Sequence, residues 1–84
     1  MVEIITVYGT EWCWSSRRIR ETLDREGIIY TWVDIDNDSK GREYVEKINN
    51  GNRSVPTIVF PGGDILVEPS DGEFQTRLLK CKKG

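Results

Sequence analysis

The fold of this chain is decided by residues 7–18, which read VYGTEWCWSSRR. An apolar run ends here, a short turn follows, and Cys13 stands where a helical pattern begins. The first N–H groups of a helix have no partner within the helix, and the helix dipole places partial positive charge there. A thiolate is favoured at such a position, and the thiolate is the nucleophile. The stretch therefore predicts strand, turn and helix, with a reactive thiol at the helix start.

The surroundings of Cys13 must supply part of this activation. The dipole alone contributes about 0.3–1 kcal/mol, so hydrogen bonds or nearby cations are needed as well. The candidates are the backbone N–H groups of Ser15 and Ser16, the Ser16 hydroxyl, and the guanidinium groups of Arg17 and Arg18. Without a histidine in the chain, activation must be electrostatic. The alternative interpretation is that Cys13 is a small buried hydrophobe, as most single intracellular cysteines are.

Length and composition exclude several classes of protein. The 84 residues predict one domain, 1–84, with a modest core, and the net charge of −2 gives no reason to expect a nucleic-acid partner. No apolar stretch approaches the ~20 residues of a membrane span, and no signal-peptide pattern opens the chain. We therefore expect a cytoplasmic protein, and a monomer. With only Cys13 and Cys81 as soft ligands, we expect no metal site and no structural disulfide.

Strand and helix patterns alternate along the rest of the chain. Strands are predicted at 3–8, 28–35, 57–60 and 65–67. Helices are predicted from Cys13 or Trp14 to Glu26, from the polar break at 36–39 to Ile48 or Asn49, and after a capping box formed by Ser70 and Glu73. The first two strands should be parallel and the last two should form a hairpin. The fold class is α/β, in the order β-α-β-α-β-β-α, with a four-stranded mixed sheet flanked by three helices.

Periodicity also predicts which side chains face inward. Ile19 and Leu23 lie on one face of the first helix, and Gly27 is a suitable residue to end it. The inward-facing positions expected elsewhere are Trp32 in the second strand, Tyr44, Val45 and Ile48 in the second helix, and Phe74, Leu78 and Leu79 in the last helix.

A second motif, SVPT at residues 54–57, precedes the third predicted strand. Proline removes a ladder hydrogen bond from a central strand, so Pro56 belongs at the first residue or in an irregular turn. From frequencies alone, its peptide bond is expected to be trans.

Together the two motifs resemble a known family. WCWSS at 12–16 after a first strand, with SVPT at 54–57 before a third, resembles the glutaredoxin branch of the thioredoxin fold over nearly the whole chain. NGNRSVP at 50–56 and EPS at 68–70 are most similar to the mycoredoxins and related bacterial glutaredoxin-like proteins. The resemblance implies that Cys13 is the nucleophilic cysteine.

The resemblance also implies the binding residues. Pro56 would be a cis-proline facing the nucleophile, and the Val55 backbone would pair with a bound substrate as an added strand does. Arg53 would meet a substrate carboxylate. Ser70 and Asp71, at the start of the last helix, would hold the far end of a low-molecular-weight thiol.

The active-site motif, Cys13 with Trp12, Trp14, Ser15 and Ser16, departs from the dithiol pattern C-x-x-C. Ser16 stands in place of the second cysteine and cannot resolve a mixed disulfide. Two origins stay open: a natural monothiol enzyme, or a Cys-to-Ser variant of a dithiol enzyme.

Two further features bear on the mechanism. Cys81 is a poor substitute for the missing thiol, since it lies about 16 Å along the last helix and a disulfide needs Cα atoms within about 7 Å. Residues 67–71, VEPSD, replace the family's glutathione-type Gly-Gly-x-Asp segment, which argues against glutathione as the preferred thiol. The candidate co-substrates are mycothiol and glutathione.

The resemblance implies a thiol-disulfide oxidoreductase with no bound cofactor. Cys13 would attack mixed disulfides between proteins and a low-molecular-weight thiol by a monothiol mechanism. Two alternatives stay open: a carrier of a [2Fe–2S] cluster held between two chains, and a non-catalytic domain that docks partners through the groove at Val55 and Pro56.

Overall fold

The computed structural model describes the backbone of residues 4–83 and the side chains of residues 4–79. Its elements are β1 (Ile5–Gly9), α1 (Trp14–Arg25), β2 (Tyr30–Asp34), α2 (Ser39–Ile48), β3 (Thr57–Val59), β4 (Ile65–Val67) and α3 (Asp71–Lys83). This order confirms the β-α-β-α-β-β-α prediction.

The four strands form one sheet in the order β2-β1-β3-β4. β1 runs parallel to β2, with Val7 beside Trp32, and antiparallel to β3, with Val7 opposite Ile58. β3 and β4 form the predicted antiparallel hairpin, with Ile58 opposite Leu66. The sheet is therefore mixed, and β2 and β4 are its edges.

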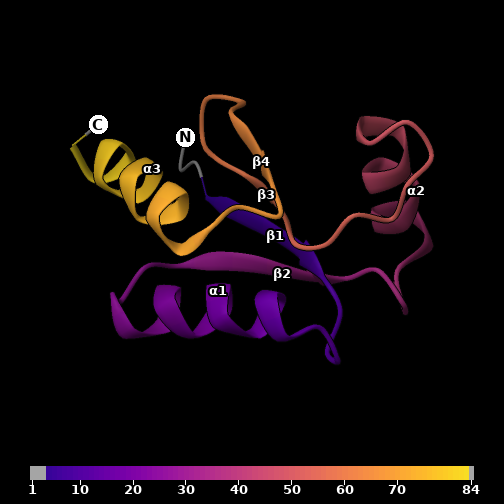
Figure 1. The fold of residues 1–84 in the computed structure, drawn as a ribbon, viewed down its shortest axis with the longest axis horizontal. Helices are drawn as coiled ribbons and strands as arrows, with labels where there is room; N and C mark the ends of the chain where they lie inside the picture. The colour runs from indigo at the N-terminus through magenta and orange to yellow at the C-terminus, as the bar shows by residue number, and fades with distance from the viewer. Residues whose placement is uncertain (1–3, 84) are drawn as a thin grey trace.

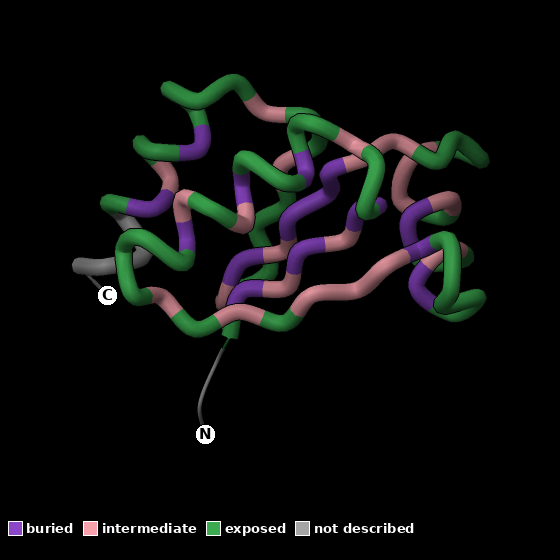
Figure 2. The backbone as a smooth tube through the Cα atoms, turned by 90° about the horizontal axis from the view of Figure 1, so that it is seen from below, coloured by how far each residue is buried: buried purple, intermediate pink, exposed green. Residues whose placement is uncertain are grey.

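The core lies between the sheet and two of the helices. Its buried side chains come from β1, β3, the segment after β3, α1 and α3: Ile5, Val7, Ile19, Leu23, Ile58, Phe60, Phe74 and Leu78. α2 packs against the other side of the sheet, where the rings of Tyr44 and Tyr8 lie 5.0 Å apart. Figure 1 shows α1 running along β2, with α2 at the opposite end of the molecule from α3. Burial concentrates in the central strands and on the inner sides of the helices (Figure 2).

Local hydrogen bonds explain where the helices begin and end. The Ile28 N–H donates to the Leu23 carbonyl at 2.9 Å, and the N–H of Gly27, at φ 70°, donates to the Asp24 carbonyl at 3.1 Å. This is the Schellman termination of α1. At α2, the Asp38 carboxylate caps the Gly41 N–H at 2.9 Å.

The predicted capping box of α3 is confirmed. The Ser70 hydroxyl accepts from the Glu73 N–H at 3.2 Å, and the Glu73 carboxylate accepts from the Ser70 N–H at 2.9 Å.

Several predicted boundaries were wrong. β1 ends at Gly9, one residue later than predicted, and the predicted first residue, Glu3, lies outside the described residues. β2 begins at Tyr30 because Ile28 completes the turn after α1, and it ends one residue short of Ile35. β3 ends at Val59, where the Phe60 N–H turns to the Asp64 carbonyl at 2.8 Å.

Two of the predicted inward positions were also wrong. Tyr44 is 37% exposed because it covers Tyr8 at the surface, and Leu79 is 60% exposed. Within residues 4–83, no helix is long and apolar enough to cross a membrane.

Candidate active site

The two sequence motifs meet at one end of the sheet. β1 and β2 are parallel, so their carboxyl ends, at Gly9 and Asp34, lie side by side. β3 runs the opposite way and begins at Thr57, which pairs with Tyr8. The turn that leads to Cys13 and the residues before Thr57 therefore share this end of the molecule, as the resemblance implied.

Cys13 is the N-cap of α1, with extended backbone at φ −79° and ψ 118°. Its carbonyl accepts from the Arg17 N–H at 3.1 Å, and its own N–H donates to the Thr10 carbonyl at 3.3 Å. The thiol is free and partly exposed. It accepts no capping hydrogen bond, so neither of the candidate N–H groups, those of Ser15 and Ser16, bonds to the sulfur. The sulfur is thus open to a reaction partner beside the unpartnered N–H groups of the first turn.

Ser16 lies beneath the active-site turn. It is 0% exposed, and its hydroxyl has no hydrogen-bond partner among the described residues. A Cβ on Gly9 would lie 2.4 Å from the Ser16 Oγ, so the serine packs directly on the end of β1. Of the candidates for a hydrogen bond to the Cys13 sulfur, the Ser16 hydroxyl therefore makes none in this structure.

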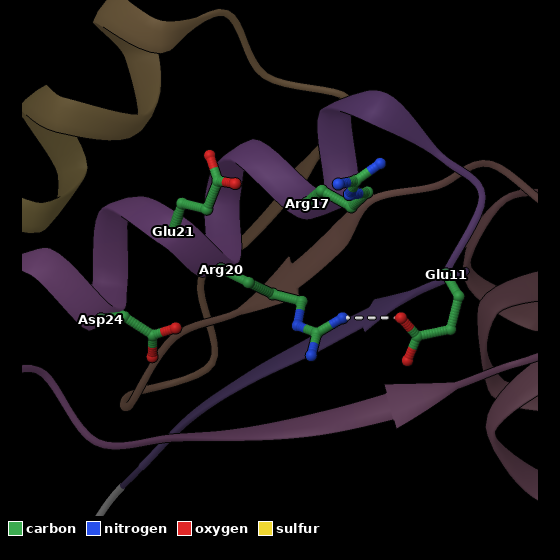
Figure 3. Close-up of a pocket in the computed structure, with 5 residues that line it drawn as sticks. All are labelled: Glu11, Arg17, Arg20, Glu21 and Asp24. Carbon is green, nitrogen blue, oxygen red and sulfur yellow. Dashed lines mark hydrogen bonds and ion pairs between the residues drawn. The ribbon is translucent and has the colours of Figure 1, made fainter.

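The two arginines that follow are directed to different surfaces. Arg18 forms an ion pair with Asp71 at the start of α3. Arg17 lines a hollow with Glu11 and Asp24 on the other side of α1 (Figure 3).

Two exposed indoles flank Cys13. Trp12 is 73% exposed, and its Nε1 donates to the Asp36 carboxylate at 2.8 Å, in the loop after β2. Trp14 is 68% exposed and lies over a hollow of ≈ 260 Å³ between the first turn of α1 and the start of α3. The other residues that line this hollow are Ser15, Arg18, Ile19, Pro69, Ser70 and Asp71.

The peptide bond between Val55 and Pro56 is cis, as the resemblance implied, so the expectation of a trans bond was wrong. The Pro56 carbonyl accepts from the Glu68 N–H at 2.8 Å. This bond joins the bend before β3 to the segment that leads from β4 to α3.

The remaining predicted binding residues are held by partners within the chain. Arg53 Nε lies 2.8 Å from a Glu46 carboxylate oxygen, and Asp71 is paired with Arg18. The Ser70 hydroxyl accepts a hydrogen bond from the Glu73 N–H in the capping box. The side chain of Cys81 lies outside the described residues.

One cluster was missed by the sequence analysis. Glu11 accepts from Arg20 Nη1 at 3.2 Å and from Trp32 Nε1 at 3.3 Å, and the Arg20 guanidinium lies 4.1 Å from the centre of the Trp32 ring. Burial acts to lower the pKa of Arg20, but its hydrogen bonds to Tyr30 and Glu11 outweigh burial and raise that pKa above its ordinary value. The cluster ties α1 and β2 to a residue two positions before Cys13. The separations of 9 and 21 residues leave no local signal for it.

No group of three or more candidate metal ligands occurs in the described part of the chain. The strand order, with helices on both faces of the sheet, defines a thioredoxin-like fold.

Comparison with known proteins then gives the family. The glutaredoxin family model matches residues 5–65. A Mycobacterium tuberculosis protein assigned to the glutaredoxins is 38% identical over 76 residues, which span 90% of each chain. Mycoredoxin 1 of Corynebacterium glutamicum is 36% identical over 74 residues, or 88% of this chain and 91% of the other. The chain belongs to the glutaredoxin family of thiol-disulfide oxidoreductases.

A solved structure supports the fold. A buckwheat glutaredoxin in complex with glutathione superposes with a TM-score of 0.67 at 22% identity, covering 95% of this chain and 80% of the buckwheat chain.

Proposed function

We propose that this protein reduces mixed disulfides between proteins and a low-molecular-weight thiol, using Cys13 alone. The observation that carries the proposal is the partly exposed Cys13 thiol at the start of α1, which accepts no capping bond and lies beside unpartnered N–H groups. Membership of the glutaredoxin family supports the class of reaction.

The reaction requires two exchanges. The Cys13 thiolate attacks the small-thiol sulfur of the mixed disulfide, a new disulfide forms on Cys13, and the target protein leaves as a thiolate that takes up a proton. A second small thiol, as its thiolate, then attacks the small-thiol sulfur bound to Cys13. The small-thiol disulfide leaves and the Cys13 thiolate returns. Neither exchange needs a thiol at Ser16.

The substrate would occupy the two sides of Cys13. An extended substrate segment would pair with the Val55 backbone beside Pro56, and the far end of the small thiol would enter the hollow beneath Trp14. The ion pairs of Arg53 with Glu46 and of Arg18 with Asp71 are exposed, and such pairs contribute about 0–1 kcal/mol. A ligand carboxylate or ammonium can therefore replace one partner at little cost.

Two small thiols are candidates. The name of mycoredoxin 1 and the family resemblance favour mycothiol, and the buckwheat complex favours glutathione. The segment VEPSD at 67–71 lacks the glycine pair of the glutathione-type motif, which favours mycothiol.

Intact-mass spectrometry tests the cycle. A Cys81→Ser variant, in which Cys13 is the only thiol, is mixed with a peptide joined by a disulfide to glutathione or to mycothiol. We expect the free peptide thiol and a small-thiol adduct on Cys13, which the same reduced thiol then removes. A folded protein that forms no adduct, or keeps its adduct in excess reduced thiol, would contradict the proposal.

A Ser16→Cys variant in the Cys81→Ser background is the matched comparison. Its new thiol should displace the small thiol from Cys13 and leave an internal disulfide, so no adduct should accumulate.

A further inference from the structure

A second surface lies on the far side of α1 from the hollow beneath Trp14. β2 is an edge strand, and in the described residues only β1 pairs with it. The Ile35 N–H donates to the Gly9 carbonyl at 2.9 Å. The backbone N–H and C=O groups of the odd-numbered residues in this segment therefore point toward β1. Since backbone groups alternate along a strand, Tyr30 and Trp32 direct their N–H and C=O groups to the free edge.

This edge lacks the lysine and proline that commonly protect edge strands against added strands. β2 reads YTWVD, which contains neither lysine nor proline and is rich in strong strand formers. Ile29, directly before β2, is 78% exposed. The edge can therefore accept another extended chain.

Two hollows run along α1 beside this edge. One of ≈ 260 Å³ is lined by Glu11, Arg17, Arg20, Glu21 and Asp24 (Figure 3). The other, of ≈ 470 Å³, is lined by Asp24, Gly27, Ile28, Ile29, Tyr30 and Trp32. Asp24 lines both, so the two hollows form one continuous surface.

The charged groups on this surface without an ion pair to a described residue are Glu21, Asp24 and Arg17, so negative charge is in excess. Arg20 is engaged by Glu11, as the dashed line in Figure 3 marks. The carboxylates of Glu21 and Asp24 have no hydrogen bond or ion pair with any described residue. Arg17 lies in the first turn of α1, near Cys13, whereas Glu21 and Asp24 lie in the second half of the helix, away from the active site.

We propose that α1 and the edge of β2 form a docking surface for an extended segment of a partner protein that carries basic side chains. The segment adds to the sheet through the backbone groups of Tyr30 and Trp32. A lysine or arginine lies against Asp24 and Glu21, and an apolar neighbour covers Ile29. The negative charges of Glu21 and Asp24 favour a partner segment with basic side chains. Docking of this segment does not require thiol exchange.

Two blocked, cysteine-free decapeptides test the surface: alternating valine and lysine, and alternating valine and glutamate. Binding is measured by amide chemical shifts and by hydrogen exchange. We expect the lysine peptide to slow exchange at the Tyr30 and Trp32 amides. Each of two exposed ion pairs should increase the affinity about threefold. The lysine peptide should therefore bind about tenfold more tightly than the glutamate peptide.

The Asp24→Asn variant tests how much the negative charge of the Asp24 carboxylate contributes to peptide binding. Affinity for the lysine peptide should fall about threefold. The fold should be kept, because Asp24 lies in the last turn of α1, where negative charge opposes the helix dipole. Glu43→Gln, at an exposed position of α2, is the matched control and should change nothing.

Three results would overturn the proposal. One is equal affinity for the two peptides. Another is perturbation confined to Val55 and Pro56. The third is an edge already protected in a concentration-dependent dimer, which would show that a second copy of this chain covers β2.

Discussion

Ser16 is a buried residue whose hydroxyl has no hydrogen-bond partner among the described residues. A buried hydroxyl without a partner costs about 1–3 kcal/mol relative to a satisfied one. A thiol is a much weaker donor and acceptor, so a cysteine would avoid most of this cost. The site accommodates a cysteine-like side chain more readily than a serine.

Ser16→Ala should therefore raise the free energy of unfolding by about 1 kcal/mol, since the unpaired oxygen is removed and only a small void remains. Urea unfolding followed by tryptophan fluorescence measures the change. Ser15→Ala, at an exposed neighbouring position, is the control and should stay within about 0.5 kcal/mol of the parent. If Ser16→Ala were destabilising, the hydroxyl would have a partner, such as a buried water.

At the scale of elements, the end of α1 places β2 beside β1. Gly27 adopts φ 70° and has open space around it, and the turn that it makes returns the chain to the sheet. Gly72, in the first turn of α3, also has open space, but its φ is not in the left-handed region.

These two glycines should therefore respond in opposite directions. Gly27→Ala should lower the free energy of unfolding by about 1–2 kcal/mol, because an L-residue is strained at this φ. Gly72→Ala should raise it by up to about 1 kcal/mol, because alanine favours the helix. Thermal unfolding of both variants measures the difference. A loss of stability in both would mean that crowding, and not φ, decides the outcome.

At the scale of the whole molecule, Tyr8 and Tyr44 join the sheet to α2. Burial raises the pKa of Tyr8 above its ordinary value of 10.0, with smaller contributions from Tyr44 and Asp38. The folded protein thus holds the Tyr8 proton more tightly than the unfolded chain does. This contribution to stability is complete below pH 10 and is lost as the pH rises through the folded pKa.

Tyr8→Phe should reduce the loss of stability above pH 10, because the variant has no phenol to ionise at this interface. Urea unfolding midpoints of parent and variant at pH 8 and above pH 10 test it. Tyr30→Phe serves as the comparison at the other face of the sheet. Parallel pH profiles for parent and Tyr8→Phe would contradict this origin of the alkaline sensitivity.

The sequence by itself determined the elements and the place of Cys13 at the start of a helix. The helix that begins after Cys13, the turn at Gly27, the capping box at Ser70 and the hairpin turn at 60–64 each depend on residues within about five positions of one another. Such signals are local, because they follow from backbone geometry, capping and alternation. The order of these elements was then sufficient to predict the sheet.

Only the tertiary structure decided what surrounds Cys13. It pairs Arg18 with Asp71 across 53 residues, brings Glu11 to Trp32 across 21, and buries Ser16 against Gly9 without a hydrogen bond. These contacts form between surfaces that meet only after the helices pack on the sheet. An ion pair or an orphaned hydroxyl depends on distances of a few ångströms, and spacing along the sequence does not specify such distances.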